Sequence, residues 1–194
     1  MPKIVDHEKR RKQIAEATWR VILNEGIEGA TVRNIAKEAN ISLGALRHYF
    51  ATQDELLVYA MNLVKEQATE RIKKIVGQNS PPKEIILNVL LELLPVNEET
   101  RAEMEVWFAF IGHVRHKQGI LKLHDDGVYE GIKVLVENMV EYGLLKDGLD
   151  KEMETERLYS LIDGLALHAI LEPGRLNKEK ITRVLTYHLE SIWV

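Results

Sequence analysis

Chain breakers are few in this 194-residue sequence, and none of them interrupts a long run of apolar residues at helical spacing. The five prolines stand near a chain end or between such runs, at positions 2, 81, 82, 95 and 173. No segment alternates apolar and polar residues between two hairpin turns, as a half-buried strand does. The sequence therefore predicts an all-α protein.

The apolar periodicity predicts helices with lengths and short connections typical of a bundle. They are expected at residues 8–24, 31–39, 42–49, 52–76, 83–94, 98–117, 119–143, 152–172 and 177–192. Thr31 and Ser42 are good N-cap residues, and Thr52 with Glu55 forms a capping box. Gly26 is expected to close the first helix.

Several kinds of site are excluded or disfavoured by what the sequence lacks. It has no cysteine, which excludes disulfides, thiolate metal sites and cysteine nucleophiles. It shows no glycine-rich phosphate loop, nucleophile elbow or His-Glu-x-x-His motif, so we expect neither an enzyme nor a bound cofactor. His113, His116 and His124 have the chemistry of zinc ligands, but ordinary surface histidines are the favoured interpretation. Adjacent aspartates at 125 and 126 would not converge on one metal ion.

The N-terminal segment MPKIVDHEKRRKQ is charged and lacks the apolar stretch of a secretory signal. No apolar run approaches the roughly 18–20 residues that span a bilayer. We therefore expect a cytoplasmic protein.

Charge is uneven along the chain. The first fifty residues hold nine Lys or Arg and six Asp or Glu, a net charge of +3 within a chain of −4, which leaves −7 for the remainder. A basic end on an acidic protein favours an anionic partner for that end. A solvated helix face accounts for so small a difference equally well.

The segments 31–39 and 42–49 form a helix-turn-helix pattern, two short helices joined by about three residues. Gly44 and Ala45 are small, so the second helix can approach base edges in a major groove closely. Arg47 can contact a guanine edge or a phosphate, and both remain open. The residues expected to contact DNA are Thr31, Arg33, Ser42, Leu43, Gly44, Ala45, Arg47, His48, Tyr49, Thr52 and Gln53.

The stretch from Lys12 to Leu57 resembles the DNA-binding domain of TetR-family transcriptional regulators. The matching residues are Ile14-Ala15-Glu16-Ala17, Gly26, Thr31-Val32-Arg33-Asn34-Ile35-Ala36, Ala39-Asn40-Ile41-Ser42, Gly44, Phe50 and Asp54-Glu55-Leu56. The resemblance implies a dimeric one-component repressor: a helix-turn-helix domain at residues 1–53, and a ligand-binding and dimerisation domain at 54–194.

Two positions depart from the family pattern. The family usually has Tyr where this chain has Arg47, and Lys where it has Gln53. Since both family residues commonly touch the DNA backbone, the operator is not implied by the resemblance. Further along, Leu94-Pro95, a Trp-bearing helix and the segment 162–167 are similar to the subgroup of choline/betaine-pathway regulators.

The helix Leu158–Leu171 is apolar nearly all round, and the last helix carries one apolar stripe. Packing both helices against a second copy gives a four-helix interface with twofold symmetry. A dimer is expected because helix-turn-helix proteins bind two DNA half-sites. The alternative is the centre of a single-chain bundle. The residues expected at the dimer interface are Leu158, Leu161, Ile162, Leu165, Ala169, Ile181, Val184, Leu185, His188, Leu189 and Ile192.

An aromatic cluster in the segment 98–117 is the candidate ligand site inside the bundle. The expected pocket residues are Met104, Trp107, Phe108, Phe110, Ile111, Tyr129 and His168. Such aromatics can enclose a quaternary ammonium ion or an apolar tail. Plain core packing is the alternative for each residue taken singly.

Together these features predict a DNA-binding transcriptional regulator, a repressor that binds a palindromic operator as a dimer and is released by a small-molecule inducer. The helix Asp54–Val76 would transmit the signal, because it belongs to both domains. The alternative function is a helical small-molecule sensor or scaffold that binds no specific DNA.

Overall fold

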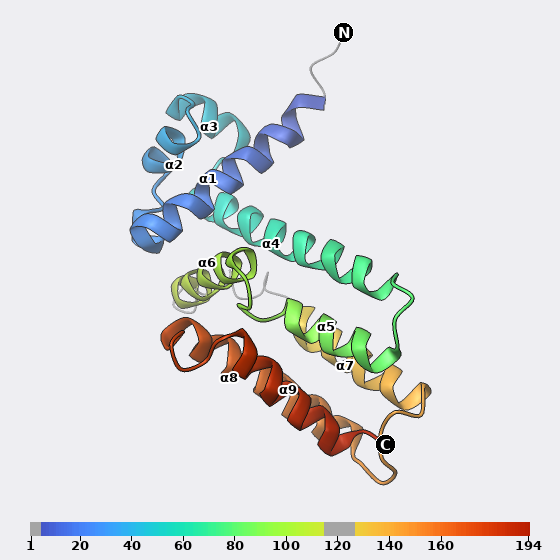
Figure 1. Cartoon of the computed structure of the whole chain (residues 1–194). Helices are drawn as coiled ribbons and strands as arrows, with labels where there is room; N and C mark the ends of the chain where they lie inside the picture. The colour runs from blue at the N-terminus through green and yellow to red at the C-terminus, as the bar shows by residue number, and fades with distance from the viewer. Residues whose placement is uncertain (1–4, 115–126) are drawn as a thin grey trace. The chain divides into compact units, whose positions relative to one another are not determined.

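The computed structural model of the protein describes residues 5–114 and 127–194. Over these residues it consists of α-helices, with no β-structure beyond one isolated bridge between Leu145 and Trp193 (Figure 1). The helices are α1 (Val5–Gly29), α2 (Val32–Glu38), α3 (Leu43–Tyr49), α4 (Gln53–Val76), α5 (Pro82–Glu92), α6 (Glu98–Val114), α7 (Gly127–Glu141), α8 (Lys151–Leu171) and α9 (Lys178–Ile192). The all-α prediction is confirmed.

Part of the prediction lies outside the described residues. It comprises the end of the helix expected at 98–117, the start of the helix expected at 119–143, and His116, His124, Asp125 and Asp126. No helix in the described part of the chain is long and apolar enough to cross a membrane.

The backbone of α1 breaks at Gly26, where φ is +72°. Glycine adopts this left-handed region without the steric cost that a Cβ atom brings. The sequence predicts the end of the first helix here. The chain turns at Gly26 and then makes a further short turn up to Gly29, which brings it to the start of α2.

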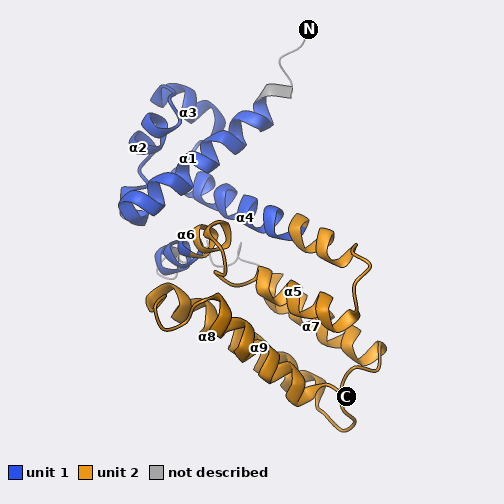
Figure 2. Cartoon of the chain, viewed as in Figure 1, with its two compact units in different colours: residues 1–69, 105–121 blue, residues 70–104, 122–194 orange. Residues whose placement is uncertain are grey.

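The chain divides into two compact units, residues 1–69 with 105–121 and residues 70–104 with 122–194 (Figure 2). Each of α4 and α6 contributes to both units. These two units are defined by which parts of the backbone pack together. The boundary predicted after residue 53 separates DNA-contacting residues from the rest and stays a prediction.

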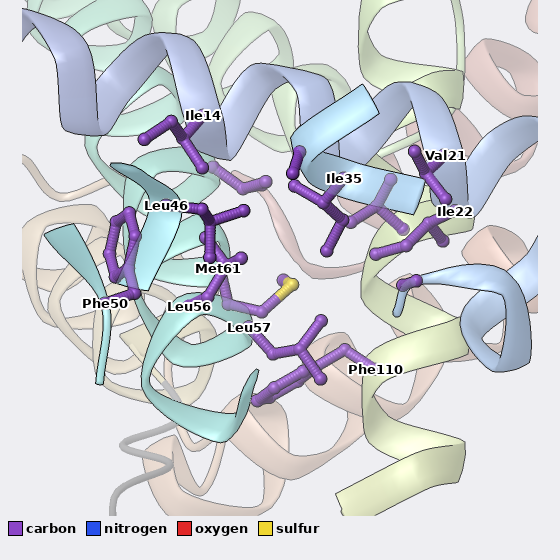
Figure 3. Packing of buried hydrophobic residues seen from close by; sticks show 14 residues of the cluster. Ile14, Val21, Ile22, Ile35, Leu46, Phe50, Leu56, Leu57, Met61 and Phe110 are labelled. Carbon is purple, nitrogen blue, oxygen red and sulfur yellow. The ribbon is translucent and has the colours of Figure 1, made fainter. Parts of the chain in front are cut away.

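One hydrophobic cluster holds the first unit together. It joins α1, α2, α3, the N-terminal part of α4 and the C-terminal part of α6 (Figure 3). Its larger buried side chains are Ile14, Val21, Ile22, Ile35, Leu46, Phe50, Leu56, Leu57, Met61 and Phe110. Burial of one such side chain contributes about 1.5–3 kcal/mol, so α2 and α3 are firmly fixed on α1 and α4. Trp19 adds a polar link from α1 to α4, since its Nε1 donates to the carbonyl of Ala60 at 3.1 Å.

The second unit is a helical bundle in which α7 packs on α8 and α5 packs on α9. Its buried side chains include Ile86, Val89, Leu90, Ile132, Val136, Met139, Leu158, Ile162, Ala166, Ile181, Leu185, Leu189 and Ile192. Asp150 and Asn177 cap α8 and α9, as their side chains accept backbone N–H groups of the first turn.

Candidate nucleic-acid interface

The turn between α2 and α3 depends on Asn40, whose φ of +52° is left-handed. The N–H of Asn40 donates to the carbonyl of Lys37 at 3.1 Å, and the N–H of Ile41 donates to that of Ala36 at 3.0 Å. This pair of bonds is a Schellman motif, which ends a helix and satisfies its last carbonyls. Asparagine tolerates this backbone region better than most residues with a Cβ atom. The break that the sequence predicts is therefore a defined turn.

One face of α3 is buried and the opposite face meets solvent. Leu46 is 0 % exposed and belongs to the hydrophobic cluster of the first unit. Gly44, Arg47 and His48 are exposed. The other predicted contact residues on this helix are half-buried: Leu43, Ala45 and Tyr49. Because Leu46 fixes the rotation of α3, Arg47 and His48 are presented outward at a defined angle.

Arg47 is a free guanidinium in this structure, in the sense that no described residue accepts a hydrogen bond from it or forms an ion pair with it. Its neighbour His48 packs edge-on against Tyr49, with ring centroids 5.6 Å apart. A free arginine on the exposed face of a short helix can form the bidentate contacts that guanine edges and phosphates accept.

Three helices in this unit begin at hydroxyl caps that the sequence predicts. The side-chain oxygens of Thr31, Ser42 and Thr52 each accept a backbone N–H from three residues on, at 3.0–3.2 Å. All three residues are exposed. The carboxylate of Glu55 accepts the N–H of Ala51 at 2.9 Å, which completes the box at the start of α4. Each helix start leaves further backbone N–H groups available to phosphate oxygens.

Gln53 connects two of these helix starts. Its Nε2 donates to the carbonyl of Ala30, the residue before the Thr31 cap, at 2.9 Å. The structure therefore brings Thr31, Thr52 and Gln53 together, with exposed Arg33 in the first turn of α2. Gln53 uses one amide hydrogen inside the protein, so it keeps a second one for a DNA contact.

Arg11 on α1 holds the end of α3 in place, and the sequence analysis did not predict this role. Its guanidinium donates to the carbonyl of Tyr49 at 3.1 Å and to the carboxylate of Glu55 at 3.5 Å. It also lies over the rings of Phe50 and Tyr59, at 4.4 and 4.6 Å from their centroids. One side chain thus ties the end of α3 to α1 and to the start of α4.

Asn34 is a second residue that the prediction did not include. Its Nδ2 donates to the carboxylate of Glu25 at 2.9 Å and to the carbonyl of Gly29 at 3.0 Å, which fixes α2 on the end of α1. Nothing local in the sequence marks Arg11 or Asn34, because both act on residues of another helix.

The expected ligand-pocket residues are divided between the two compact units. Trp107, Phe108, Phe110 and Ile111 belong to the first, and Met104, Tyr129 and His168 to the second. Phe110 is buried in the hydrophobic cluster of the first unit, with Trp107 and Ile111 packed against it. Phe110 therefore has the core role that the sequence left as the alternative, and the pocket stays a prediction.

In the second unit, Tyr129 packs edge-on against Tyr159, with centroids 5.4 Å apart. A hydrogen bond to Glu156 raises the pKa of Tyr129. His168 is exposed, and its Nδ1 lies 3.6 Å from the carboxylate of Glu172.

The expected interface residues of α8 and α9 are mostly inside this chain's own core. Eight are buried there: Leu158, Ile162, Leu165, Ala169, Ile181, Leu185, Leu189 and Ile192. Leu161, Val184 and His188 are half-buried. These eight side chains pack in the core of their own chain, and their place at a dimer interface stays a prediction. The exposed large apolar side chains on these helices are Met153, Leu167 and Leu171 of α8 and Tyr187 of α9, at 51, 41, 65 and 80 % exposed.

Two family descriptions match the sequence. Residues 14–60 match bacterial regulatory proteins of the tetR family, and residues 82–194 match the C-terminal domain of BetI-type transcriptional repressors. Among curated relatives, the HTH-type transcriptional regulator PksA of Bacillus subtilis (strain 168) is 60 % identical over 194 residues, covering 100 % of this chain and 95 % of that protein. The HTH-type transcriptional regulator BetI of Vibrio vulnificus (strain YJ016) is 27 % identical, covering 98 % and 96 %.

Solved structures show the same fold. A transcriptional regulator from Rhodococcus sp. Rha1 superposes with a TM-score of 0.79 at 25 % identity, covering 94 % of this chain and 95 % of that one. A regulator from Saccharomonospora viridis, solved in complex with choline, gives a TM-score of 0.85 at 21 % identity and covers 96 % and 99 %.

Proposed function

Because the chain belongs to the TetR family of transcriptional regulators, and is a helix-turn-helix regulator rather than an enzyme, we propose that it represses transcription by binding a palindromic DNA operator. The observation that carries this proposal is the exposed pair Arg47 and His48 on a helix that buried Leu46 holds in place. The hydroxyl-capped starts of α2 and α4 would clamp the phosphates beside it. The protein then acts in the cytoplasm, where its DNA is.

We assign different roles to the residues of this surface. Gly44 and Ala45 let the start of α3 approach base edges, with Ser42 and Leu43 alongside. Arg47 reads a base edge or binds a phosphate, as the free guanidinium allows. Thr31, Arg33, Thr52 and Gln53 contact the backbone, while His48 and Tyr49 add phosphate or sugar contacts.

The operator requires two copies of α3 about 34–36 Å apart, one helical turn of DNA, which a twofold dimer supplies. Exposed Leu167 and Leu171 on α8 and Tyr187 on α9 support an interface made by the outward faces of these helices. Substitution of both Leu167 and Tyr187 by Glu should yield monomers in sedimentation velocity and weaken operator binding. The exposed change Lys133→Glu on α7 should do neither. Persistent dimers in the double variant would exclude this interface.

A small-molecule ligand is the third part of the proposal. The neighbour from Saccharomonospora viridis holds choline, which supports an organic cation for this chain as well. Met104, Trp107, Phe108, Ile111, Tyr129 and His168 remain the proposed lining residues, without Phe110, which packs in the core of the first unit. Isothermal titration of choline into the parent and into Trp107→Ala tests the site: loss of heat in the variant is expected, and equal heats would remove Trp107 from it.

Selection from randomised duplex DNA is the direct test of the function. The purified protein should enrich an inverted repeat with half-sites one turn apart. Arg47→Ala with His48→Ala should lose about tenfold or more in affinity for that sequence, since a bidentate arginine contact supplies about 1–3 kcal/mol. Lys133→Ala, an exposed change on α7, should bind like the parent. If no sequence is enriched after ligand removal, the alternative of a helical sensor or scaffold gains the support.

A further inference from the structure

His7, in the first turns of α1, lies against the end of α3. Its ring centroid is 4.9 Å from that of Tyr49 and 6.2 Å from that of His48. His7 and His48 are both exposed. Two imidazoles from different helices therefore stand side by side on the same edge of the surface that carries Arg47. No local pattern in the sequence places His7 there.

Two described carboxylates near this pair accept hydrogen bonds from other side chains. Glu8 accepts the hydroxyl of Tyr59 on α4 at 2.5 Å, and Glu55 of α4 accepts from Arg11. Arg10 and Arg11 on α1 and Arg47 on α3 are cations on the same two helices. Within the described part of the chain, no carboxylate forms an ion pair with His7 or His48. A proton taken up by either ring therefore enters no ion pair with a carboxylate of the described residues.

A DNA phosphate would supply a counter-charge. A neutral imidazole offers one N–H donor, whereas the protonated form offers two and carries a positive charge. Histidine is the side chain that ordinarily changes charge between pH 5 and 8. An anion held between two imidazoles favours protonation of both, because each cation is then paired.

We propose that His7 and His48 jointly hold one phosphate of the DNA backbone, and that operator binding takes up protons at this pair. The inference rests on the proposed function, since it assigns a further contact and a pH response to the same interface. α1 thus becomes a part of the DNA-binding surface, beside α2, α3 and α4.

The test measures operator affinity by fluorescence anisotropy as a function of salt at pH 6 and pH 8, with the inverted repeat from the selection experiment as the probe. For the parent, affinity should be about tenfold higher at pH 6, which corresponds to about 1.4 kcal/mol. The plot of log K against log salt should steepen by about one unit, as expected when one more phosphate is neutralised.

Three variants locate the effect. His7→Gln keeps a donor without a titrating charge and should lose about half of the pH response, and the double change with His48→Gln should abolish it. His7→Lys carries a fixed charge and should bind at pH 8 with the affinity that the parent shows nearer pH 6. Thermal melts establish that each variant is folded, as expected for changes at exposed positions.

The outcomes separate the two proposals. If the parent binds the operator but His7→Gln keeps the full pH response and salt slope, the phosphate site is wrong and the proposed function stands. If His7→Lys shows the same pH response as the parent, the inference is likewise overturned. If the parent enriches no DNA at either pH, both the function and this inference fall.

Discussion

Each compact unit contains one arginine that ties several helices together, and the two do so by different chemistry. In the first unit, Arg11 is 23 % exposed, lies over two aromatic rings and has one carboxylate, that of Glu55, at 3.5 Å. In the second, Arg71 on α4 is 18 % exposed and has three carboxylates within 3.1 Å.

The contacts of Arg71 are short and mostly buried. Its guanidinium binds Glu103 on α6 through two bonds of 2.6 and 2.9 Å, Glu92 on α5 at 2.7 Å and Glu99 on α6 at 3.1 Å. The hydrogen bond to Glu103 is the main cause that raises the pKa of Arg71. Burial raises the pKa of Glu103, Arg71 opposes the rise, and Glu99 and Glu92 add to it. The guanidinium of Arg71 thus forms ion pairs with three carboxylates.

This difference indicates which unit depends on charge pairing for its stability. Removing Arg11 leaves two aromatic rings that still pack and one carboxylate, of Glu55, that is 41 % exposed and can be hydrated. Removing Arg71 leaves Glu103, only 10 % exposed, beside two further carboxylates. A buried charge without a partner costs far more than a lost surface pair.

The largest effect is therefore expected from Arg71→Met. It should lower the free energy of unfolding by about 3 kcal/mol, since it strands the buried carboxylate of Glu103. Urea denaturation followed by circular dichroism measures the change. Arg175→Met is the matched control: Arg175 pairs with Glu172 at 2.7 Å, but both are about half exposed, and little or no change in the free energy of unfolding is expected.

The second substitution Glu103→Gln sharpens the result. Added to Arg71→Met, it removes the stranded charge and should recover part of the lost stability. A double variant as unstable as the sum of the two single variants would show that charge is not the cause. If the free energy of unfolding of Arg71→Met lay within about 0.5 kcal/mol of that of the parent, the proposed difference between the two arginines would be wrong.

The next effect concerns Arg11→Met in the first unit. The loss should be about 1–2 kcal/mol, from the cation–π contacts and the bond to the carbonyl of Tyr49. Operator affinity should fall as well, because the end of α3 loses a support. Arg10→Met is the control on the adjacent residue, since Arg10 bonds only Gln13 among the described residues. Equal losses at the two positions would refute the role given to Arg11.

Neither arginine cluster could be predicted from the sequence, and the reason is separation along the chain. Arg11 bonds residues 38 and 44 positions away, and Arg71 bonds residues 21, 28 and 32 positions away. Local patterns do not specify such pairs. The hydroxyl caps Thr31, Ser42 and Thr52, by contrast, act on residues within the next turn, and they are confirmed.

The outward face of α3 was predictable for a similar reason. The spacing of Leu46 and Phe50 shows which side is buried, and Arg47 and His48 then point outward. For α8 the same reasoning fails, because a helix that is apolar all round does not reveal which side faces its own chain. Leu158 and Ile162 face inward, and Leu167 and Leu171 outward.

The smallest effect is a pH dependence of stability in the second unit. Burial lowers the pKa of His188 on α9, and the charge of Arg157 lowers it further, against an opposing effect of Glu154. The unfolded chain takes up the proton near the ordinary value of 6.5, but the folded chain only at lower pH. Between these values the unfolded state binds more protons, so stability falls as the pH falls through that window.

The loss due to His188 should stay below about 1 kcal/mol between pH 7 and 5, because the ring is only half-buried. His188→Gln should remove that part of the slope. In the first unit, burial and the bond to Glu8 raise the pKa of Tyr59 to about 12, so this hydroxyl stays protonated near neutral pH. Protection factors from hydrogen exchange, corrected for the intrinsic rate at each pH, should therefore fall between pH 7 and pH 5 more in α8 and α9 than in α1 to α3. A larger loss of protection in α1 to α3 would show that the acid-sensitive group lies in the first unit, which would contradict the role given to His188.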